Sequence, residues 1–187
     1  VYMRGRSKLP VYVENAAEFL TTGNKRFTNK SIAIISSVSG NTLEMIELVD
    51  KVHEIGGKVF SFIDTPNTVL TQPDKQDYLI LYPKNEQLKF YMTANYFMFK
   101  NGEFAEYEDY NQNMEENLAK VLVNVEKQVD AWAYHYAKQK VEFLDKHPDL
   151  PHYFIGAGNQ YGATYSYAMC YWEEQHWIRT KSIHSAE

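Results

Sequence analysis

The feature that most constrains the fold is a strand–loop–helix–strand pattern that begins at Ser31 and reads SIAIISSVSGNTLEMIELVDKVHEIGGKVFSFID. Its apolar run Ile32 to Ile35 is short and rich in isoleucine, as a buried strand of a parallel sheet should be. Apolar residues then recur at helical spacing through residues 43–55, and Gly56-Gly57 closes the helix as a C-cap. A second strand follows at 58–63. The pattern therefore predicts a doubly wound α/β fold with a parallel sheet.

The same alternation continues and then restarts in the last quarter of the chain. YLILY, residues 78–82, is predicted as a third strand, and the aromatic-rich residues 87–99 as a helix. Near the end, HYFI (152–155) is a predicted strand, followed by a Gly-rich turn, a helix over about 161–177 and the start of another strand at 181–185. We expect two related α/β halves, both incomplete here.

The segment between the halves contains only helix-compatible residues. Residues 107–147 hold no Gly or Pro, and this stretch is long enough to break into two helices. We predict a first domain over residues 1–100 with its N-terminal part missing, a helical linker over 101–147, and the start of a second domain over 148–187 with its C-terminal part missing. Both ends of the chain read as cuts, since Val1 is no start residue and Glu187 falls inside a patterned stretch.

Charge and cysteine usage exclude several functional classes. The chain carries 19 Lys and Arg against 24 Asp and Glu, a net charge of −5, with no basic block that could bind nucleic acid. No apolar run reaches the roughly 18 residues of a bilayer span, and no signal peptide is visible. The one cysteine, Cys170, is compatible with a reducing compartment. We expect a soluble, cytoplasmic protein that binds neither nucleic acid nor membrane.

The first candidate site is the loop Ser37-Val38-Ser39-Gly40-Asn41-Thr42, between a strand end and a helix start. Open α/β sheets bind ligands at this position, and backbone N–H groups at a helix start favour an anion. Three hydroxyls can add donors to phosphate oxygens, and Gly40 allows close approach of a ligand. The loop has no lysine, so it is no Walker A P-loop. The alternative is a helix cap, with Ser or Asn as N-cap and Glu44 completing a capping box.

The second candidate loop follows the strand at 152–155 and contains Gly156, Gly158 and Asn159. It reads GxGxxxG rather than the GxGxxG of dinucleotide-binding folds, so a nicotinamide cofactor is disfavoured. A tight strand-to-helix turn that lines a cleft is the simpler interpretation.

The helix after this loop carries a pair of carboxylates, Glu173 and Glu174, near its C-terminal end. Acidic residues there oppose the helix dipole, which suits either a solvated surface pair or a carboxylate held as a general base. The histidines show no spacing typical of metal ligands, and no Cys/His/Asp cluster is present.

Two motifs together resemble a known family. ISSVSGNTLE after an apolar strand is similar to the signature of the sugar isomerase (SIS) domains that bind phosphosugars, and GAGNQYGATYSYAMCYWEEQHWIRTKSIHSAE resembles the start of a second SIS domain. The detail of the second motif, with Trp177-Ile178 and Ile183-His184-Ser185, is nearest to fructosamine 6-phosphate deglycases, including the fructoselysine type. The resemblance covers about Tyr12 to Glu187.

This resemblance implies two flavodoxin-like SIS domains per chain, a homodimer or higher homo-oligomer with active sites near the interface, and neither a metal nor an organic cofactor. The phosphate loop maps onto Ser37, Ser39, Gly40 and Thr42, and the family's catalytic glutamate onto Glu174, with Glu173 as an alternative one residue away. The family's earlier strand and Gly/Ser turn would precede Val1, and its catalytic histidine would lie beyond Glu187.

The activity implied is cleavage of a 6-phosphofructosyl or glucosyl amino acid to glucose 6-phosphate and free amino acid, by proton abstraction at C1. Alternatives are an aldose–ketose isomerase, an aminosugar phosphate deaminase or aminotransferring relative, and a sensor that binds a phosphosugar without converting it. The sequence does not identify the attached amino acid.

Overall fold

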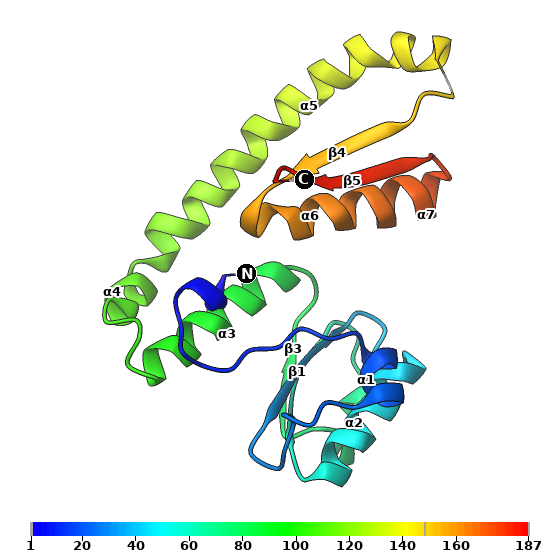
Figure 1. Ribbon diagram of the computed structural model, residues 1–187. Helices are drawn as coiled ribbons and strands as arrows, with labels where there is room; N and C mark the ends of the chain where they lie inside the picture. The colour runs from blue at the N-terminus through cyan, green and yellow to red at the C-terminus, as the bar shows by residue number, and fades with distance from the viewer. Residues whose placement is uncertain (1, 148, 187) are drawn as a thin grey trace. The chain divides into compact units, whose positions relative to one another are not determined.

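The computed structural model describes residues 2–147 and 149–186 (Figure 1). The chain divides into two compact units. The first unit is Leu9–Phe97, and the second combines Val1–Lys8 with Met98–Glu187. The predicted domain boundaries at residues 100 and 147 stay predictions.

A three-stranded parallel sheet forms the centre of the first unit. Its strands β1 (Ile32–Ser37), β2 (Lys58–Ile63) and β3 (Tyr78–Leu81) lie in the order β1-β2-β3. Ser37 pairs with Ile63, and Ile63 pairs with Leu81, so the three strands end in one row at the carboxyl edge of the sheet. The predicted parallel α/β architecture is confirmed.

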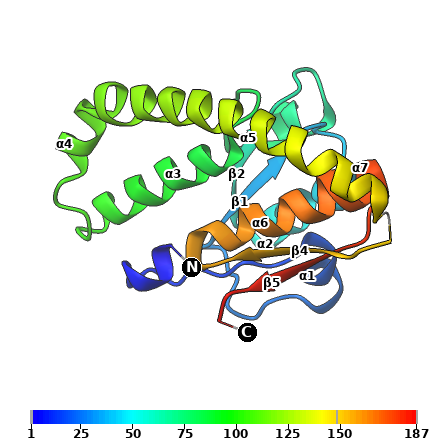
Figure 2. The same ribbon diagram turned by 90° about the horizontal axis from the view of Figure 1, so that it is seen from above.

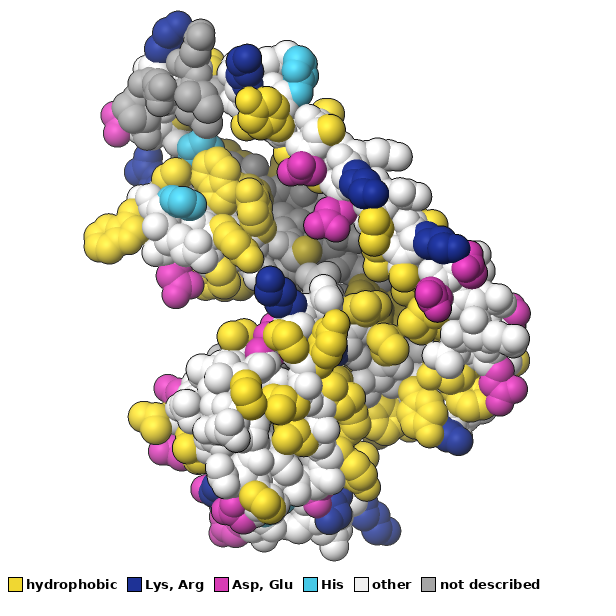
Figure 3. All heavy atoms as spheres, turned by 180° about the vertical axis from the view of Figure 1, so that it is seen from behind, with side chains coloured by type: hydrophobic (Ala, Val, Ile, Leu, Met, Phe, Trp, Pro, Cys, Tyr) yellow, Lys and Arg dark blue, Asp and Glu magenta, His cyan; other side chains and the backbone are white. Residues whose placement is uncertain are grey.

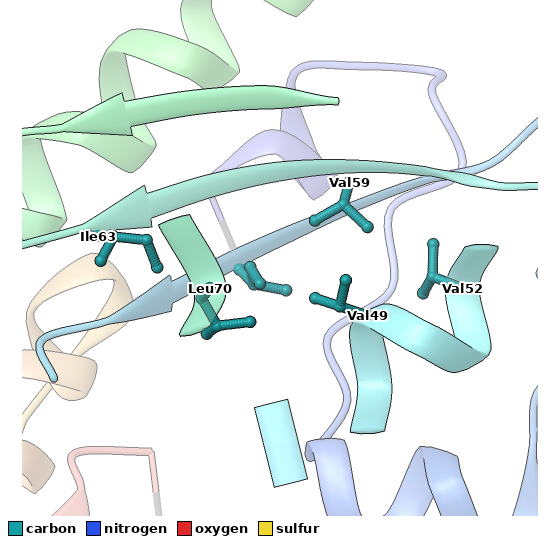
Figure 4. Packing of buried hydrophobic residues seen from close by; sticks show 6 residues of the cluster. Val49, Val52, Val59, Ile63 and Leu70 are labelled. Atoms are coloured by element: carbon teal, nitrogen blue, oxygen red, sulfur yellow. The ribbon is translucent and has the colours of Figure 1, made fainter. Parts of the chain in front are cut away.

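Helices cover both faces of this sheet. The helices of the unit are α1 (Ala16–Thr22), α2 (Leu43–Ile55) and most of α3 (Glu86–Lys100), with short 3-10 turns η2 (Val69–Thr71) and η3 (Pro73–Lys75). Val49 and Val52 of α2 are fully buried against Val59 and Ile63 of β2, with Leu70 completing the cluster (Figure 4). On the opposite face, Phe90 of α3 makes an edge-to-face contact with Phe62, with ring centroids 5.4 Å apart.

The second unit contains a βαβ element. Strands β4 (His152–Gly156) and β5 (Thr180–His184) are parallel, with His152 paired to Thr180. The 3-10 turn η5 (Gly158–Gln160) leads into α6 (Tyr161–Ser166), the π-helical segment η6 (Tyr167–Glu173) and α7 (Glu174–His176), which follow one another without a break (Figure 2). Phe154 packs against Tyr167 and Trp172 and fixes this helix on the strands.

The remainder of the second unit is helical. After η1 (Met3–Gly5) at the N-terminus, the chain forms α4 (Tyr107–Gln112), a π-helical turn η4 (Glu115–Ala119) and the long α5 (Lys120–Lys146). The break predicted within 107–147 therefore lies close to its N-terminal end. Within the described part of the chain, no helix combines the length and the apolar character that a bilayer span needs.

Candidate functional site

The predicted loop Ser37–Thr42 lies at the carboxyl edge of the first sheet. β1 ends at Ser37 and α2 begins at Leu43, so the loop joins a strand end to a helix start. Gly40 adopts φ +64°, and a Cβ there would lie 2.8 Å from the Thr68 Cβ. Both the backbone conformation and the space available therefore require glycine at this position.

The three hydroxyls of the loop converge on one another. Thr42 Oγ1 lies 3.4 Å from Ser37 Oγ and 3.5 Å from Ser39 Oγ. Ser37 is buried and its Oγ accepts the Gly40 N–H at 3.0 Å, whereas Ser39 and Thr42 are exposed. Ser37 therefore stabilises the loop conformation through its hydrogen bond to Gly40. Ser39 and Thr42 lie on the solvent side of the loop.

A neighbouring segment, Thr65–Leu70, braces this loop. Val38 O accepts hydrogen bonds from the Thr65 N–H at 3.1 Å and the Thr65 hydroxyl at 2.8 Å. Asn41 Oδ1 accepts the Val69 N–H at 3.0 Å, and Gly40 O accepts the Leu70 N–H at 3.0 Å. The side-chain carbonyl of Asn41 is thus engaged in holding the loop. This brace is not predictable from the sequence, because only the tertiary fold brings the two segments together.

The N-terminus of α2 has no side-chain cap. Thr42 occupies the N-cap position with extended φ and ψ, yet no side chain accepts a hydrogen bond there, so the alternative of a capping box with Glu44 is wrong. The helix has 13 residues, and its first N–H groups and positive dipole end face the same side as the hydroxyls. This combination can bind an oxyanion such as a phosphate.

A buried ion pair lies next to the loop. Asp64 directly follows β2 and its N–H donates to Ser37 O at 3.3 Å. Its carboxylate accepts from Lys89 Nζ at 2.9 Å and from the Lys84 N–H at 2.8 Å. Burial raises the pKa of Asp64, but these partners outweigh burial and leave the pKa below its ordinary value. An acidic residue directly after a buried strand is the sequence signal that could have identified Asp64 as a residue near the site.

The second loop makes a tight turn after β4. Gly156 ends the strand, and a Cβ there would lie 2.8 Å from the Thr164 Cβ. Gly158 has φ +52°, and Asn159 lies in the turn η5 that follows. Gly156 O accepts the Ser185 N–H at 2.8 Å, which ties this turn to the end of β5.

The two candidate carboxylates have different surroundings. Glu173 Oε1 accepts from the Thr180 hydroxyl at 2.6 Å and from the Thr180 N–H at 3.1 Å, so Glu173 anchors the start of β5. Glu174 is exposed and begins α7 directly after the π-helical segment. A π-helical insertion shifts the helix register by one residue, and such insertions are frequent at functional sites.

Glu174 and the second loop lie at opposite ends of the βαβ element. The helical segment from Tyr161 to Glu174 runs from the carboxyl end of β4 to the amino end of β5, and at about 1.5 Å per residue it separates them by roughly 20 Å. The hydroxyl loop belongs to the first unit. Over residues 2–147 and 149–186, no three His, Cys, Asp or Glu side chains are arranged to hold a metal ion.

Comparison with known proteins supports the predicted family. No model of a protein family matches the chain. The chain is 25% identical over 178 residues to fructosamine deglycase FrlB of Bacillus subtilis strain 168, covering 92% of this chain and 52% of that protein. The chain therefore spans about half the length of this curated relative.

Solved structures share the fold. A protein from Salmonella typhimurium LT2, provisionally named a phosphosugar isomerase, matches 97% of this chain and 55% of its own length with a TM-score of 0.80 at 24% identity. A protein of the same provisional name from Bacillus subtilis matches with a TM-score of 0.80 at 21% identity, and the match covers 97% of this chain and 56% of that chain. The C-terminal domain of glucosamine-fructose-6-phosphate aminotransferase from Francisella tularensis matches with a TM-score of 0.59 at 16% identity. This match covers 100% of this chain and 54% of that chain.

The fold thus defines a mixed α/β protein with parallel strands, of the kind seen in these structures. The similarity to fructosamine deglycase FrlB and to these structures supports the resemblance to SIS-domain proteins that the two motifs predicted.

Proposed function

We propose that the intact protein is a phosphosugar-processing enzyme, and specifically a deglycase that converts a 6-phosphofructosyl amino acid to glucose 6-phosphate and free amino acid. The observation that carries this proposal is the loop Ser37–Thr42, in which three hydroxyls converge at the start of an α2 helix that has no side-chain cap. The similarity to a fructosamine deglycase over 92% of the chain supports the finer assignment.

The loop would bind the sugar phosphate. Exposed Ser39 and Thr42 hydroxyls and the first N–H groups of α2 are donors, and the helix dipole favours a negative charge. Ser37, Val38, Gly40 and Asn41 would keep these donors in place through the contacts with Thr65–Leu70. Binding energy from the phosphate, which lies away from the reacting carbons, can then be used to orient those carbons.

Glu174 would act as the general base. It would take a proton from C1 of the open-chain ketoamine, and the electron pair would form an enolamine between C1 and C2. Protonation at C2 gives an imine at C1, which water hydrolyses to glucose 6-phosphate and the free amine. A positioned base contributes about 10²- to 10⁴-fold in rate. Glu173 is less suited to this role, since its carboxylate already holds Thr180.

The proposal includes a homodimer or higher oligomer with active sites near the interface. One stripe of α5 exposes apolar side chains, namely Val121, Val125, Val129, Trp132 and Tyr136. Figure 3 displays apolar side chains between the charged ones along this helix. Aromatic residues are enriched in interfaces, which supports this part of the proposal. We also propose a cytoplasmic location, because a phosphorylated sugar does not cross a bilayer unaided.

The experiment that tests the site is direct binding to the full-length protein by calorimetry. Fructose 6-phosphate should bind, and unphosphorylated fructose should bind at least tenfold more weakly, because the loop recognises the phosphate. Equal binding of the two ligands, or no binding of either, would contradict the assignment of the loop. Binding without turnover of any sugar phosphate would instead identify a sensor.

A further inference from the structure

The turn Tyr82–Asn85, which connects β3 to α3, has a strained backbone. Lys84 has φ +65° and Asn85 has φ +60°, so two consecutive non-glycine residues occupy the left-handed region. Residues other than glycine avoid this region unless the surrounding structure holds them there, and such strain gathers at binding and switch sites. Pro83 precedes them and fixes its own φ, which stiffens the turn.

Asp64 is the group that holds this turn. One carboxylate oxygen accepts the Lys84 N–H at 2.8 Å, and the other accepts Lys89 Nζ at 2.9 Å. The Lys89 ammonium also donates to Tyr82 O, so the ion pair contacts the turn at Tyr82 and at Lys84. The side chains of Lys89 and Asp64 are only 8% and 11% exposed, which makes this a shielded ion pair. The positive charge of Lys89 is therefore neutralised by Asp64.

The turn lies on the same sheet edge as the hydroxyl loop. The Tyr82 N–H donates to Ile63 O at 3.1 Å, and Ile63 pairs with Ser37 at the end of β1. Neighbouring strands lie about 4.8 Å apart, so the turn and the loop are separated by roughly 10 Å across the sheet. Lys84 is exposed, and among the described residues none lies within ion-pairing distance of its ammonium group. The loop Ser37–Thr42 itself has no cationic side chain.

We propose that Lys84 is a specificity-determining residue whose ammonium binds an oxyanion of the substrate, and that Asp64 is a positioning residue that keeps Lys84 over the site. This inference rests on the proposed function. The oxyanion is either the phosphate or the carboxylate of the attached amino acid, which share the same chemistry toward an ammonium. A lysine fixed on a strained, stiff turn loses less freedom on binding than one on a mobile loop.

The test uses Lys84→Asn and Lys84→Arg in the full-length protein. Asn tolerates the left-handed conformation, so Lys84→Asn keeps the turn and removes the charge, whereas Lys84→Arg keeps the charge. Lys30→Asn is the matched control, because Lys30 is also exposed but lies before β1, at the opposite edge of the sheet. Dissociation constants are measured by calorimetry for fructose 6-phosphate and for 6-phosphofructosyl-lysine.

We expect Lys84→Asn to weaken binding about tenfold, and Lys84→Arg and Lys30→Asn to stay within about threefold of wild type. Weakening of both ligands assigns Lys84 to the phosphate, and weakening of the lysine conjugate alone assigns it to the carboxylate. Unchanged binding of both ligands by Lys84→Asn overturns this inference while leaving the proposed function intact. Failure of the wild type to bind either ligand overturns the proposed function itself.

Asp64→Asn tests the positioning role. It leaves Lys89 without its carboxylate, so circular dichroism must first establish that the variant folds, and the Lys84 variants decide the inference without it. In a folded Asp64→Asn protein we expect the dissociation constant to rise as in Lys84→Asn, with kcat within about threefold of wild type. The double variant should show no further weakening, because both changes act through Lys84. Additive effects would contradict a positioning role for Asp64.

Discussion

Replacing Asp77 with Asn should destabilise the first unit by an amount that follows from the structure. Asp77 precedes β3 and accepts from Lys58 Nζ at 2.6 Å and the Val59 N–H at 2.8 Å, while His53 Nε2 lies at 3.0 Å. Burial raises the pKa of Asp77, but these partners outweigh it and lower the pKa from 3.8 to about 2. At 1.36 kcal/mol per pKa unit this corresponds to about 2.4 kcal/mol. Because the Lys58 side chain is 59% exposed, salt screening reduces the expected loss to about 1–2 kcal/mol.

The sign of the pH dependence follows from the lowered pKa. A carboxyl whose pKa is lower in the folded protein contributes its full stability above about pH 4, and this contribution is lost as the pH falls through about 2. Wild type and Asp77→Asn should therefore differ at pH 7 and converge toward pH 2.

Urea unfolding measured by two signals is a suitable assay. All three tryptophans, Trp132, Trp172 and Trp177, belong to the second unit, so far-UV circular dichroism reports on both units and tryptophan fluorescence on the second alone. Asp74→Asn is the matched control, because Asp74 is exposed and lies three residues from Asp77. A change below about 0.5 kcal/mol for Asp77→Asn at pH 7, or an equal change for Asp74→Asn, would show that the contacts of Asp77 do not stabilise the first unit.

Two further predictions concern the candidate site. Gly40→Ala should cost at least about 1 kcal/mol more than Gly23→Ala in urea unfolding, because both glycines have positive φ but only Gly40 would place a Cβ against Thr68; equal costs would contradict the close contact. Glu173→Ala should lower the stability reported by tryptophan fluorescence by about 1–2 kcal/mol, and Glu174→Ala by less than about 0.5 kcal/mol, because only Glu173 holds Thr180. The reverse order would contradict these roles.

The elements of the fold were largely predictable because hydrophobic periodicity is local. The apolar run Ile32 to Ile35, the helical spacing of residues 43–55 and the left-handed C-cap at Gly56 all appear in the structure. The loop Ser37–Thr42 could be located for the same reason, since it lies between a strand and a helix that are each predictable from the sequence.

The interactions that shape the site could not be predicted in this way. The brace between Asn41 and Val69 and the pair between Asp64 and Lys89 join residues more than 20 positions apart, which no local pattern specifies. The π-helical segment before Glu174 is also invisible in composition, because its single extra residue is accommodated by backbone hydrogen bonding. The sequence therefore left Glu173 and Glu174 as alternatives.

Release of glucose 6-phosphate from 6-phosphofructosyl-lysine by the full-length protein, followed with a coupled dehydrogenase, decides whether the proposed reaction occurs. We expect steady release by the wild type, at least about 100-fold slower turnover for Glu174→Gln with substrate binding retained, and substantial turnover for Glu173→Gln. Release by Glu174→Gln at near the wild-type rate would contradict the assignment of Glu174 as the base. No release by the wild type, with fructose 6-phosphate still bound, would contradict the deglycase reaction.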